Sequence, residues 1–211
     1  MKKVLLLSDL HGRSPITDKD DINLVDLILL AGDFSQGAES KKIFESQVKR
    51  ISEFFGSKKV YLIPGNNDKP YALSFNYPEN LINFHDKIEL IDSENQFVLI
   101  GFGGAKIGIR NEIAFREEEI FEKLDNLFKK QRKNFPDSNV ILFVHDPPNN
   151  TNCDRTFMRI HAGSESVRKI IEIYQPILTV CGHIHESQGI DTIGITKIIN
   201  AGSHIYKKYA I

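Results

Sequence analysis

The chain has 211 residues and a mass of 24.0 kDa, which suits one compact domain. Hydrophobic residues make up 41% and charged residues 26%, as in ordinary globular proteins that bury a substantial core. The 27 basic and 28 acidic residues nearly cancel, leaving a formal net charge of −1. This balance excludes a broad basic surface for nucleic acid, which would need an excess of Lys and Arg. We expect a single domain over residues 1–211.

Cysteine usage and hydropathy indicate a cytoplasmic protein that does not enter a membrane. Cys153 and Cys181 match no CxxC pattern and are too few for a disulfide framework, so we expect reduced thiols. The amino-terminal MKKVLLLSDL carries lysines, but its apolar run covers only Val4–Leu7, which is too short for a signal peptide. No stretch approaches the ~20 apolar residues of a membrane span.

In chain order, short apolar runs alternate with helical patterns, which is typical of an α/β fold. The first half predicts three buried strands and one amphipathic helix, at Val4–Leu7, 24–30, Val60–Ile63 and, for the helix, about 38–55. Three further runs, at residues 81–86, 87–92 and 97–105, carry weak helix signals. We predict that these runs form a set of strands.

The second half continues the alternation of strands and helices. Residues 146–159 are polar and rich in Pro and Asn, which indicates a long loop, and long loops in compact domains are often functional. The predicted elements are a helix near 116–132, a strand at 140–144, a helix at Glu165–Tyr174, and strands at 177–180, 193–199 and 205–210. The last two strands are expected to belong to a second sheet, within one domain whose sheets are flanked by helices.

Polar side chains that suit metal coordination follow five of the predicted strands. They are Asp9 and His11, Asp33, Asn66 with Asn67 and Asp68, His145, and His183 with His185. Ligands bind outside the carboxyl ends of strands in open α/β sheets, so these groups converge if the strands are neighbours. Residues two apart in an extended segment point to the same side, so each Asp-x-His or His-x-His pair can face one centre. Nitrogen and oxygen ligands without thiolate suit Zn²⁺, Mn²⁺, Fe or Ni²⁺.

Each of these signals has an ordinary structural explanation when it is taken alone. An isolated Asp-x-His is more often a turn than a site, and a Gly-Asp after a strand is usually a turn or a helix cap. His85 and His204 are best explained as surface or packing residues. The ordered set is different, because five separate strand ends that carry suitable groups are improbable by chance.

The ordered set also resembles a known family. The series D-x-H, G-D, G-N-x-[D/E], a lone His and G-H-x-H is that of the calcineurin-like metallophosphoesterases. Here it reads Asp9-Leu10-His11, Gly32-Asp33, Gly65-Asn66-Asn67-Asp68, His145 and Gly182-His183-Ile184-His185. The resemblance implies a four-layer α-β-β-α sandwich of two mixed sheets, with a two-metal centre at the loop ends.

The resemblance also implies how two divalent ions, Mn, Ni, Fe or Zn, would be held. One ion would bind Asp9, His11, Asp33 and His185, and the other would bind Asp33, Asn66, His145 and His183. Asp33 would bridge the two ions, which repel each other at ~3.5–4 Å and need an anion between them. With only two carboxylates among the ligands, the centre stays net positive and attracts phosphate.

Asn67 occupies a position where many relatives have a histidine that assists the leaving group. An amide cannot donate a proton, and general acid help is typically worth roughly 10²–10⁴ in rate. His161 is a candidate substitute, and so is Asp146, if the long loop folds over the metals. Arg13, together with Asn66 and Asn67, is a candidate donor to phosphate oxygens. Asp68 is expected to bond the second nitrogen of a ligating imidazole, as carboxylates commonly do.

The sequence therefore predicts a metal-dependent hydrolase of phosphate esters, in which a hydroxide activated by the ions attacks phosphorus. Phosphodiesters are preferred over monoesters because Asn67 provides no acid. The expected partner is a small-molecule phosphate ester or nucleotide, and an oligomer is compatible with the sequence. The alternative is a protein-interaction scaffold with weak or no catalysis, as in the retromer subunit that resembles this family. The presence of all seven ligands favours catalysis.

Overall fold

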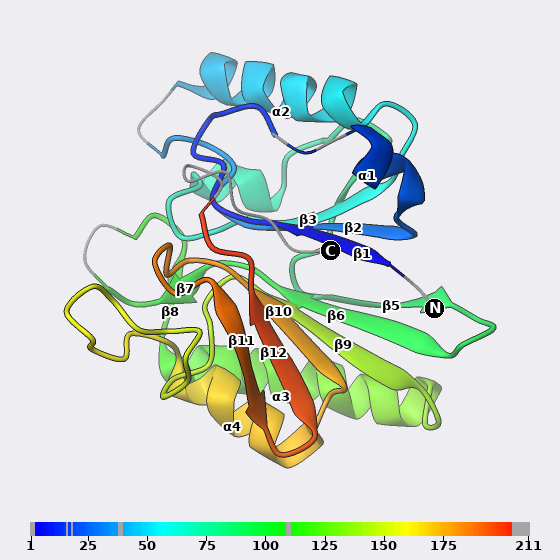
Figure 1. Cartoon of the computed structure of the whole chain (residues 1–211), viewed down its shortest axis with the longest axis vertical. Helices are drawn as coiled ribbons and strands as arrows, with labels where there is room; N and C mark the ends of the chain where they lie inside the picture. Colours follow the sequence, from blue (N-terminus) through cyan, green and yellow to red (C-terminus); the bar gives the residue numbers. More distant parts are fainter. Residues whose placement is uncertain (1–2, 16, 18, 38–39, 109–110, 204–211) are drawn as a thin grey trace.

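The computed structural model describes residues 3–15, 17, 19–37, 40–108 and 111–203. The chain forms four stacked layers, with helix α2 on one outer face, two β-sheets in the middle and helices α3 and α4 on the other outer face (Figure 1). Three hydrophobic clusters correspond to the three spaces between these layers. The predicted α/β sandwich is therefore confirmed.

The first sheet has four strands in the spatial order β1-β2-β3-β4. Their bounds are Val4–Leu7, Leu27–Ala31, Val60–Ile63 and Leu81–Asn83. Among the described residues all three pairings are parallel, so this part of the sheet contains no antiparallel pair of the kind that the family resemblance implied. The reason is that helices α1 (Lys19–Leu24) and α2 (Lys41–Phe55) return the chain to the start of the sheet before β2 and β3.

The second sheet has six strands in the order β11-β12-β10-β9-β6-β5 and is mixed. Its strands in chain order are β5 (Lys87–Asp92), β6 (Phe97–Phe102), β9 (Asn139–Val144), β10 (Leu178–Cys181), β11 (Gly189–Ile193) and β12 (Thr196–Asn200). The four central strands run parallel, and the edge strands β5 and β11 are antiparallel to their neighbours. The short strands β7 (Ala105–Lys106) and β8 (Ala114–Phe115) pair separately.

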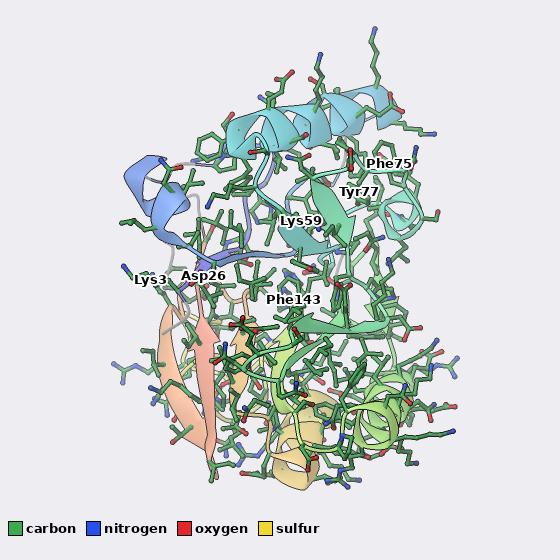
Figure 2. All side chains as sticks on the ribbon, turned by 90° about the vertical axis from the view of Figure 1, so that its right-hand side faces the viewer. Lys3, Asp26, Lys59, Phe75, Tyr77 and Phe143 are labelled. Carbon is green, nitrogen blue, oxygen red and sulfur yellow. The ribbon has the colours of Figure 1, made fainter. Side chains whose placement is uncertain are left out.

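Helix α2 covers the outer face of the first sheet. Phe44, Val48 and Ile51 lie on its buried face, as the apolar periodicity predicts. Phe44 meets the ring of Phe75 at a centroid distance of 5.0 Å, and Phe75 and Tyr77 fill the space beside the helix (Figure 2). They follow a short 3₁₀ helix, Pro70–Leu73.

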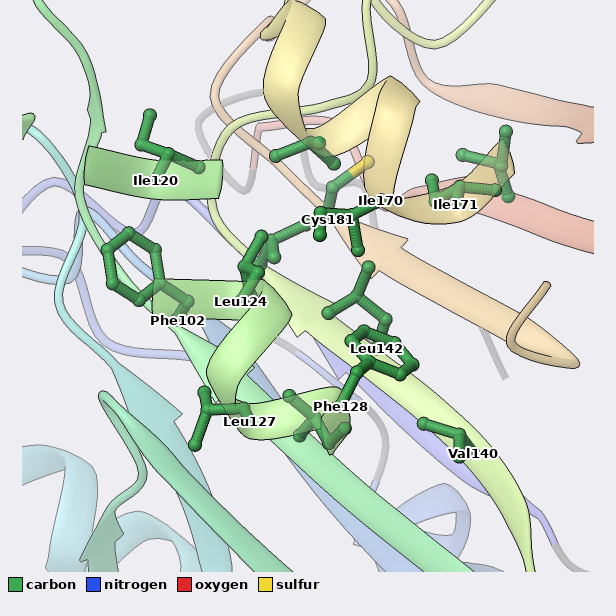
Figure 3. Packing of buried hydrophobic residues seen from close by; sticks show 14 of the residues in the cluster. Phe102, Ile120, Leu124, Leu127, Phe128, Val140, Leu142, Ile170, Ile171 and Cys181 are labelled. Carbon is green, nitrogen blue, oxygen red and sulfur yellow. The ribbon is translucent and has the colours of Figure 1, made fainter. Parts of the chain in front are cut away.

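Helices α3 (Glu117–Asn134) and α4 (Glu165–Tyr174) cover the outer face of the second sheet. Figure 3 shows Leu124 and Phe128 of α3 and Ile170 of α4 packed around Leu142 of β9. Glu117 also accepts hydrogen bonds from the backbone N–H groups of residues 165 and 166 at the start of α4. A carboxylate is favourable at that helix end, so one side chain ties the two helices together.

The space between the sheets is filled by inward-facing strand residues. Leu6 and Leu29 come from the first sheet, and Phe143 and Val180 come from the second. Figure 2 shows Phe143 between the two layers. This apolar cluster joins the two sheets, and it thereby holds together the strand ends that carry the polar motifs.

Most predicted elements are confirmed within a few residues, with two differences. Helix α1 is not predicted by the sequence, because its hexapeptide KDDINL is too short and polar to show periodicity. The predicted strand at 193–199 is interrupted by the turn of the β11–β12 hairpin, which uses Gly194 at φ 59°. The predicted strand at 205–210, the first residues of the helix predicted at 38–55, and His204 lie outside the described residues.

Candidate metal centre

Six of the seven predicted ligands form two compact groups at the ends of the strands. The first group consists of Asp9, His11 and His185, and the second consists of Asp33, His145 and His183. Within each group, one potential ligand atom per residue lies within 4.8 Å of the others. The seventh residue, Asn66, contacts His145 of the second group. The division resembles the one that the family resemblance implies, except that Asp33 belongs to the second group alone.

The first group joins the end of β1 to the loop after β10. His185 Nε2 lies 3.1 Å from Asp9 Oδ1 and 3.0 Å from His11 Nε2. His11 Nε2 lies 3.8 Å from Asp9 Oδ1. Atoms bound to one ion at ~2.0–2.2 Å are about 3 Å apart, which these spacings approach. The three side chains therefore fit a shared divalent cation.

The second group is built around the imidazole of His145 at the end of β9. Its Nδ1 is 2.6 Å from the carbonyl oxygen of Ala31, to which it donates when Nδ1 is protonated. Its Nε2 lies 2.9 Å from Asn66 Oδ1 and 3.6 Å from Asp33 Oδ2. The backbone carbonyl thus orients the ring so that Nε2 faces the oxygens of two other candidate ligands.

His183 of the second group connects it to the first. The backbone N–H of His183 donates to Asp9 Oδ2 at 3.0 Å. The rings of His145 and His183 lie side by side, with centroids 5.0 Å apart. The residues that follow β1, β9 and β10 therefore form one continuous cluster that spans both sheets.

Four of the candidate ligands have left-handed backbone conformations. The φ angles are 55° at Asp9, 46° at His11, 51° at Asp33 and 66° at His183. Such angles are uncommon outside glycine and cost of order 1–3 kcal/mol each, so they persist only where the surroundings enforce them. Backbone hydrogen bonds supply that constraint, from Asp9 N to Gly32 O and from His11 N to Asp33 O. Strain of this kind is concentrated at functional sites.

The motif glycines allow the candidate ligands to approach closely. A β-carbon at Gly32 would lie under 3.0 Å from the His145 ring, and one at Gly65 would collide with Asp33. At Gly182 it would meet Ser8 and Asp9. The glycines that precede Asp33, Asn66 and His183 are therefore required by the packing of a neighbouring ligand, and not only by the turn.

Burial and neighbouring charges set the protonation of the metal-free centre. Burial opposes protonation of His145, but Asp33 raises the pKa of this imidazole to about 10. Burial likewise opposes ionisation of Asp33, yet His145 holds the pKa of this carboxyl below its usual range. Burial, followed by the charge on His145, lowers the pKa of His183 to about 4. Without a bound cation, the positive charge on protonated His145 thus balances the negative charge on Asp33.

Of the three predicted catalytic residues, Asn67 contacts a candidate ligand and His161 does not. Asn67 lies at the centre, but its backbone N–H and its side-chain amide both donate to Asp33. His161 is bound through Nδ1 to Asp154 at 2.6 Å, and among the described residues no hydrogen bond or ion pair joins it to a candidate ligand. Arg13 is exposed in the turn after His11. The structure therefore brings Asn67, but not His161, into contact with the ligand groups.

One expectation about a nearby carboxylate is wrong. Asp68 does not bond an imidazole, since it accepts from the backbone N–H groups of Ser35 and Gly65 and from the Ser35 hydroxyl. It fixes the loops that carry Asp33 and Asn66 relative to each other. Asp146 is buried and accepts from the Lys106 N–H through Oδ2, so it supports β7.

Two residues that sequence reasoning missed orient the candidate ligands. The Ser8 hydroxyl donates to Asp9 Oδ2. Asn111 Oδ1 accepts from Asn66 Nδ2 at 2.9 Å, which directs the Asn66 oxygen toward His145. Ser8 adjoins a motif and could have been suspected, whereas Asn111 lies 45 positions from Asn66 with no local signal.

Asp146 should give the metal-free protein a distinct pH dependence. Burial raises the pKa of Asp146 to about 7, from an ordinary value of 3.8. Between these values the folded state holds a proton that the unfolded chain has released, so the free energy of unfolding falls as the pH rises, by roughly 2–4 kcal/mol. Asp146→Asn should flatten this dependence in urea unfolding with chelator between about pH 4 and pH 8. Equal slopes for both proteins would contradict this assignment.

Comparisons with known proteins agree with the geometry. The family model described as calcineurin-like phosphoesterase matches residues 2–187. An uncharacterized protein of Methanocaldococcus jannaschii is 31% identical over 212 aligned residues, covering 98% of this chain and 91% of that protein. A probable glycerophosphodiester phosphodiesterase of Arcobacter nitrofigilis is 26% identical over 165 residues, covering 76% of this chain but only 56% of that protein.

Solved structures share the same architecture. A protein of Thermus thermophilus superposes with a TM-score of 0.65 at 17% identity, over 95% of this chain and 88% of that one. This likeness concerns the fold alone. None of the helices in the described part of the chain has the length and apolar character that a bilayer crossing requires. Because the family model spans every metal-binding motif and most of the sequence, the chain belongs to the calcineurin-like phosphoesterase family.

Proposed function

We propose that the protein is a phosphodiesterase that depends on two divalent metal ions. The observation that carries the proposal is the pair of ligand groups, Asp9 with His11 and His185, and Asp33 with His145 and His183. A relative at 26% identity is a probable glycerophosphodiester phosphodiesterase, which supports a diester substrate. The free, buried Cys153 and Cys181 agree with a reducing, cytoplasmic location.

The ligand assignment follows the two groups. Asp9, His11 and His185 would hold one ion, and Asn66, His145 and His183 would hold the other, with Asp33 shared between them. Bound ions of this kind activate water as a nucleophile at neutral pH and neutralise charge that develops on the phosphoryl oxygens. Donors with only nitrogen and oxygen are compatible with Mn, Ni, Fe or Zn.

The chain's own residues define what happens to the leaving group. Water loses one proton to solvent, its oxygen forms a bond to phosphorus, and the bond from phosphorus to the leaving oxygen breaks. Asn67 hydrogen-bonds but carries no proton to give, so the leaving oxygen departs as an anion and is protonated by solvent. Good leaving groups, such as phenolates, are therefore preferred over alkoxides.

Asn67→His should restore a proton donor. We expect the variant to gain roughly tenfold or more in kcat/KM for alkyl phosphodiesters, whose leaving groups are poor, and to gain little for nitrophenyl esters. The comparison is made by steady-state kinetics on both substrates with the same metal. A loss on both substrates, or no change, would contradict the role given to Asn67.

Hydrolysis of bis-p-nitrophenyl phosphate with added Mn²⁺, Ni²⁺ or Zn²⁺ tests the proposed function. Turnover that needs metal and exceeds the turnover of p-nitrophenyl phosphate is the expected result. Metal binding is measured separately by calorimetry, with two ions per chain expected. Two bound ions without any turnover would favour the alternative, a scaffold that retains the metal sites but binds another protein.

A further inference from the structure

The long loop after β9 presents large apolar side chains to solvent. Phe157 and Met158 are each 79% exposed, and Ile160 is 57% exposed. The loop, yellow in Figure 1, projects from the molecule beside the short strands β7 and β8. Singly exposed apolar residues are normal on protein surfaces, but a contiguous group generally marks a binding site. We call these three residues the apolar tip.

The apolar tip stands on a well-braced loop. Asp154 is fully buried and acts as the hub of the loop. Its carboxylate accepts from the backbone N–H groups of Asn150, Thr151 and Gly163 and contacts His161 Nδ1. Hydrogen bonds of this kind hold the two arms of the loop together, which also explains why His161 does not reach the ligand groups.

The tip itself is closed by further hydrogen bonds. Thr156 N donates to Ile160 O at 3.0 Å, and Arg159 N donates to Thr156 O at 2.7 Å. The apolar side chains are therefore held outward by a formed turn. When a ligand covers apolar groups that a rigid backbone holds in water, the free energy of the system falls, and little ordering of the loop is needed.

The tip is also fastened to the candidate metal centre. Glu186 directly follows the candidate ligand His185, and its Oε1 accepts from the Phe157 N–H at 2.7 Å. The Ser187 hydroxyl donates to the carbonyl oxygen of Arg155. The loop therefore has a fixed position relative to the segment that carries His185.

Two cationic side chains accompany the apolar tip. Arg155 and Arg159 are both exposed. Within the described part of the chain, no ion pair with a carboxylate involves either guanidinium. An unneutralised cation next to an apolar surface complements a ligand that carries a phosphate and an apolar group on the same molecule.

From this combination, and resting on the proposed function, we propose that the apolar tip is a substrate-binding element. Phe157, Met158 and Ile160 would contact an alkyl, acyl or aryl group on the phosphodiester, while the phosphate lies at the metal centre. The preferred substrates are then diesters with an apolar group close to phosphorus, and small polar diesters are poorer substrates.

A series of alkyl p-nitrophenyl phosphates tests this proposal. Methyl, butyl and octyl esters share one leaving group and one negative charge, and they differ only in apolar length. We expect kcat/KM for the octyl ester to exceed that for the methyl ester at least tenfold, since each fully buried methylene is worth roughly fourfold. Assays are run below the concentration at which the octyl ester forms micelles.

A variant with Phe157→Ser, Met158→Ser and Ile160→Ser should reduce the octyl-to-methyl ratio to about twofold or less. The matched control is Ile195→Ser, because Ile195 is 75% exposed but lies at the β11–β12 turn. The control variant should retain the wild-type ratio. Unfolding midpoints of all proteins establish that the loop substitutions leave the fold intact. An unchanged ratio in the triple variant would overturn the proposal.

The other outcomes separate this inference from the proposed function. Turnover of both esters by the wild-type protein at equal rates would leave the phosphodiesterase standing and overturn the role of the apolar tip. No turnover of either ester with any metal would overturn both. Equal rates with tip-dependent binding to phosphatidylglycerol vesicles would assign the tip to a membrane surface. Equal rates with a dimer that the triple variant dissociates would assign it to a second copy of the chain.

Discussion

Asp33→Asn should abolish phosphoesterase activity and leave at most one tightly bound ion per chain. Asp33 is the only candidate ligand assigned to both ions, and a neutral amide cannot offset their mutual repulsion. We expect kcat/KM to fall by at least roughly 10³-fold. This exceeds the 10–100-fold loss that is typical when a residue only orients a ligand.

Asp68→Asn is the matched control for this substitution. Asp68 is also fully buried, and it contacts Ser35 and Gly65. Asp68 positions the loops but is not assigned to an ion. Its substitution should therefore lower activity by roughly 10–100-fold while both ions stay bound. Calorimetric titration with Mn²⁺ distinguishes the two variants without any activity measurement.

Asp33→Asn should also change the pKa of His145 when no metal is bound. Asp33 is the main group that raises the pKa of His145 against the effect of burial. In Asp33→Asn the pKa of His145 should therefore fall well below about 10, as NMR titration of the imidazole would show. An Asp33→Asn protein that binds two ions and retains activity within tenfold would refute the bridging assignment.

The composition of the centre was predictable because its signals are local. Asp9 and His11 follow the buried run Val4–Leu7, and His145 follows the strand before the long loop. Parallel strands bring their carboxyl ends to one edge, so the order of the motifs is enough to infer that they meet. The two groups formed by these side chains agree with that inference.

The supporting contacts were not predictable, because they depend on tertiary structure. Asp68 lies beside the motif residues Asn66 and Asn67, yet its main partner Ser35 is 33 positions away. Nothing in the sequence near His161 indicates that Asp154 binds its ring. In each case several polar partners are chemically suitable, and only the packing of the loops selects one of them.

The direction of the first sheet illustrates the same limit. The apolar runs predict that strands exist, but a run of four buried residues is compatible with either pairing direction. Here the short helix α1 between β1 and β2 makes the pairing parallel. Its sequence has no amphipathic period that would reveal it, so the sequence does not predict this helix.

Gly65→Ala should severely damage the candidate metal centre. A β-carbon at Gly65 would lie well under 3.0 Å from the carboxylate and from the backbone nitrogen of Asp33. Gly65 does not have a positive φ, so the obstacle is the close approach itself rather than the backbone conformation. Neither neighbour can move freely, because Asp33 N belongs to the backbone and its carboxylate is held by Asn67.

We expect Gly65→Ala to lower the free energy of unfolding by roughly 2–4 kcal/mol, as overpacking of a rigid site does. Activity should fall at least 10²-fold, since a displacement of about 1 Å at a reacting centre has that effect. Gly189→Ala is the control, because the nearest atom to a β-carbon there is 4.0 Å away. The control should change stability by less than about 1 kcal/mol.

Urea unfolding with and without Mn²⁺ separates the two effects of Gly65→Ala. The wild-type protein and Gly189→Ala should both gain stability from the metal, because an ion that binds only the folded state shifts the equilibrium toward it. Gly65→Ala should gain much less, since its displaced Asp33 no longer completes both sites. If Gly65→Ala matched Gly189→Ala in stability, metal response and activity, the close packing of Gly65 on Asp33 would have no part in forming the centre.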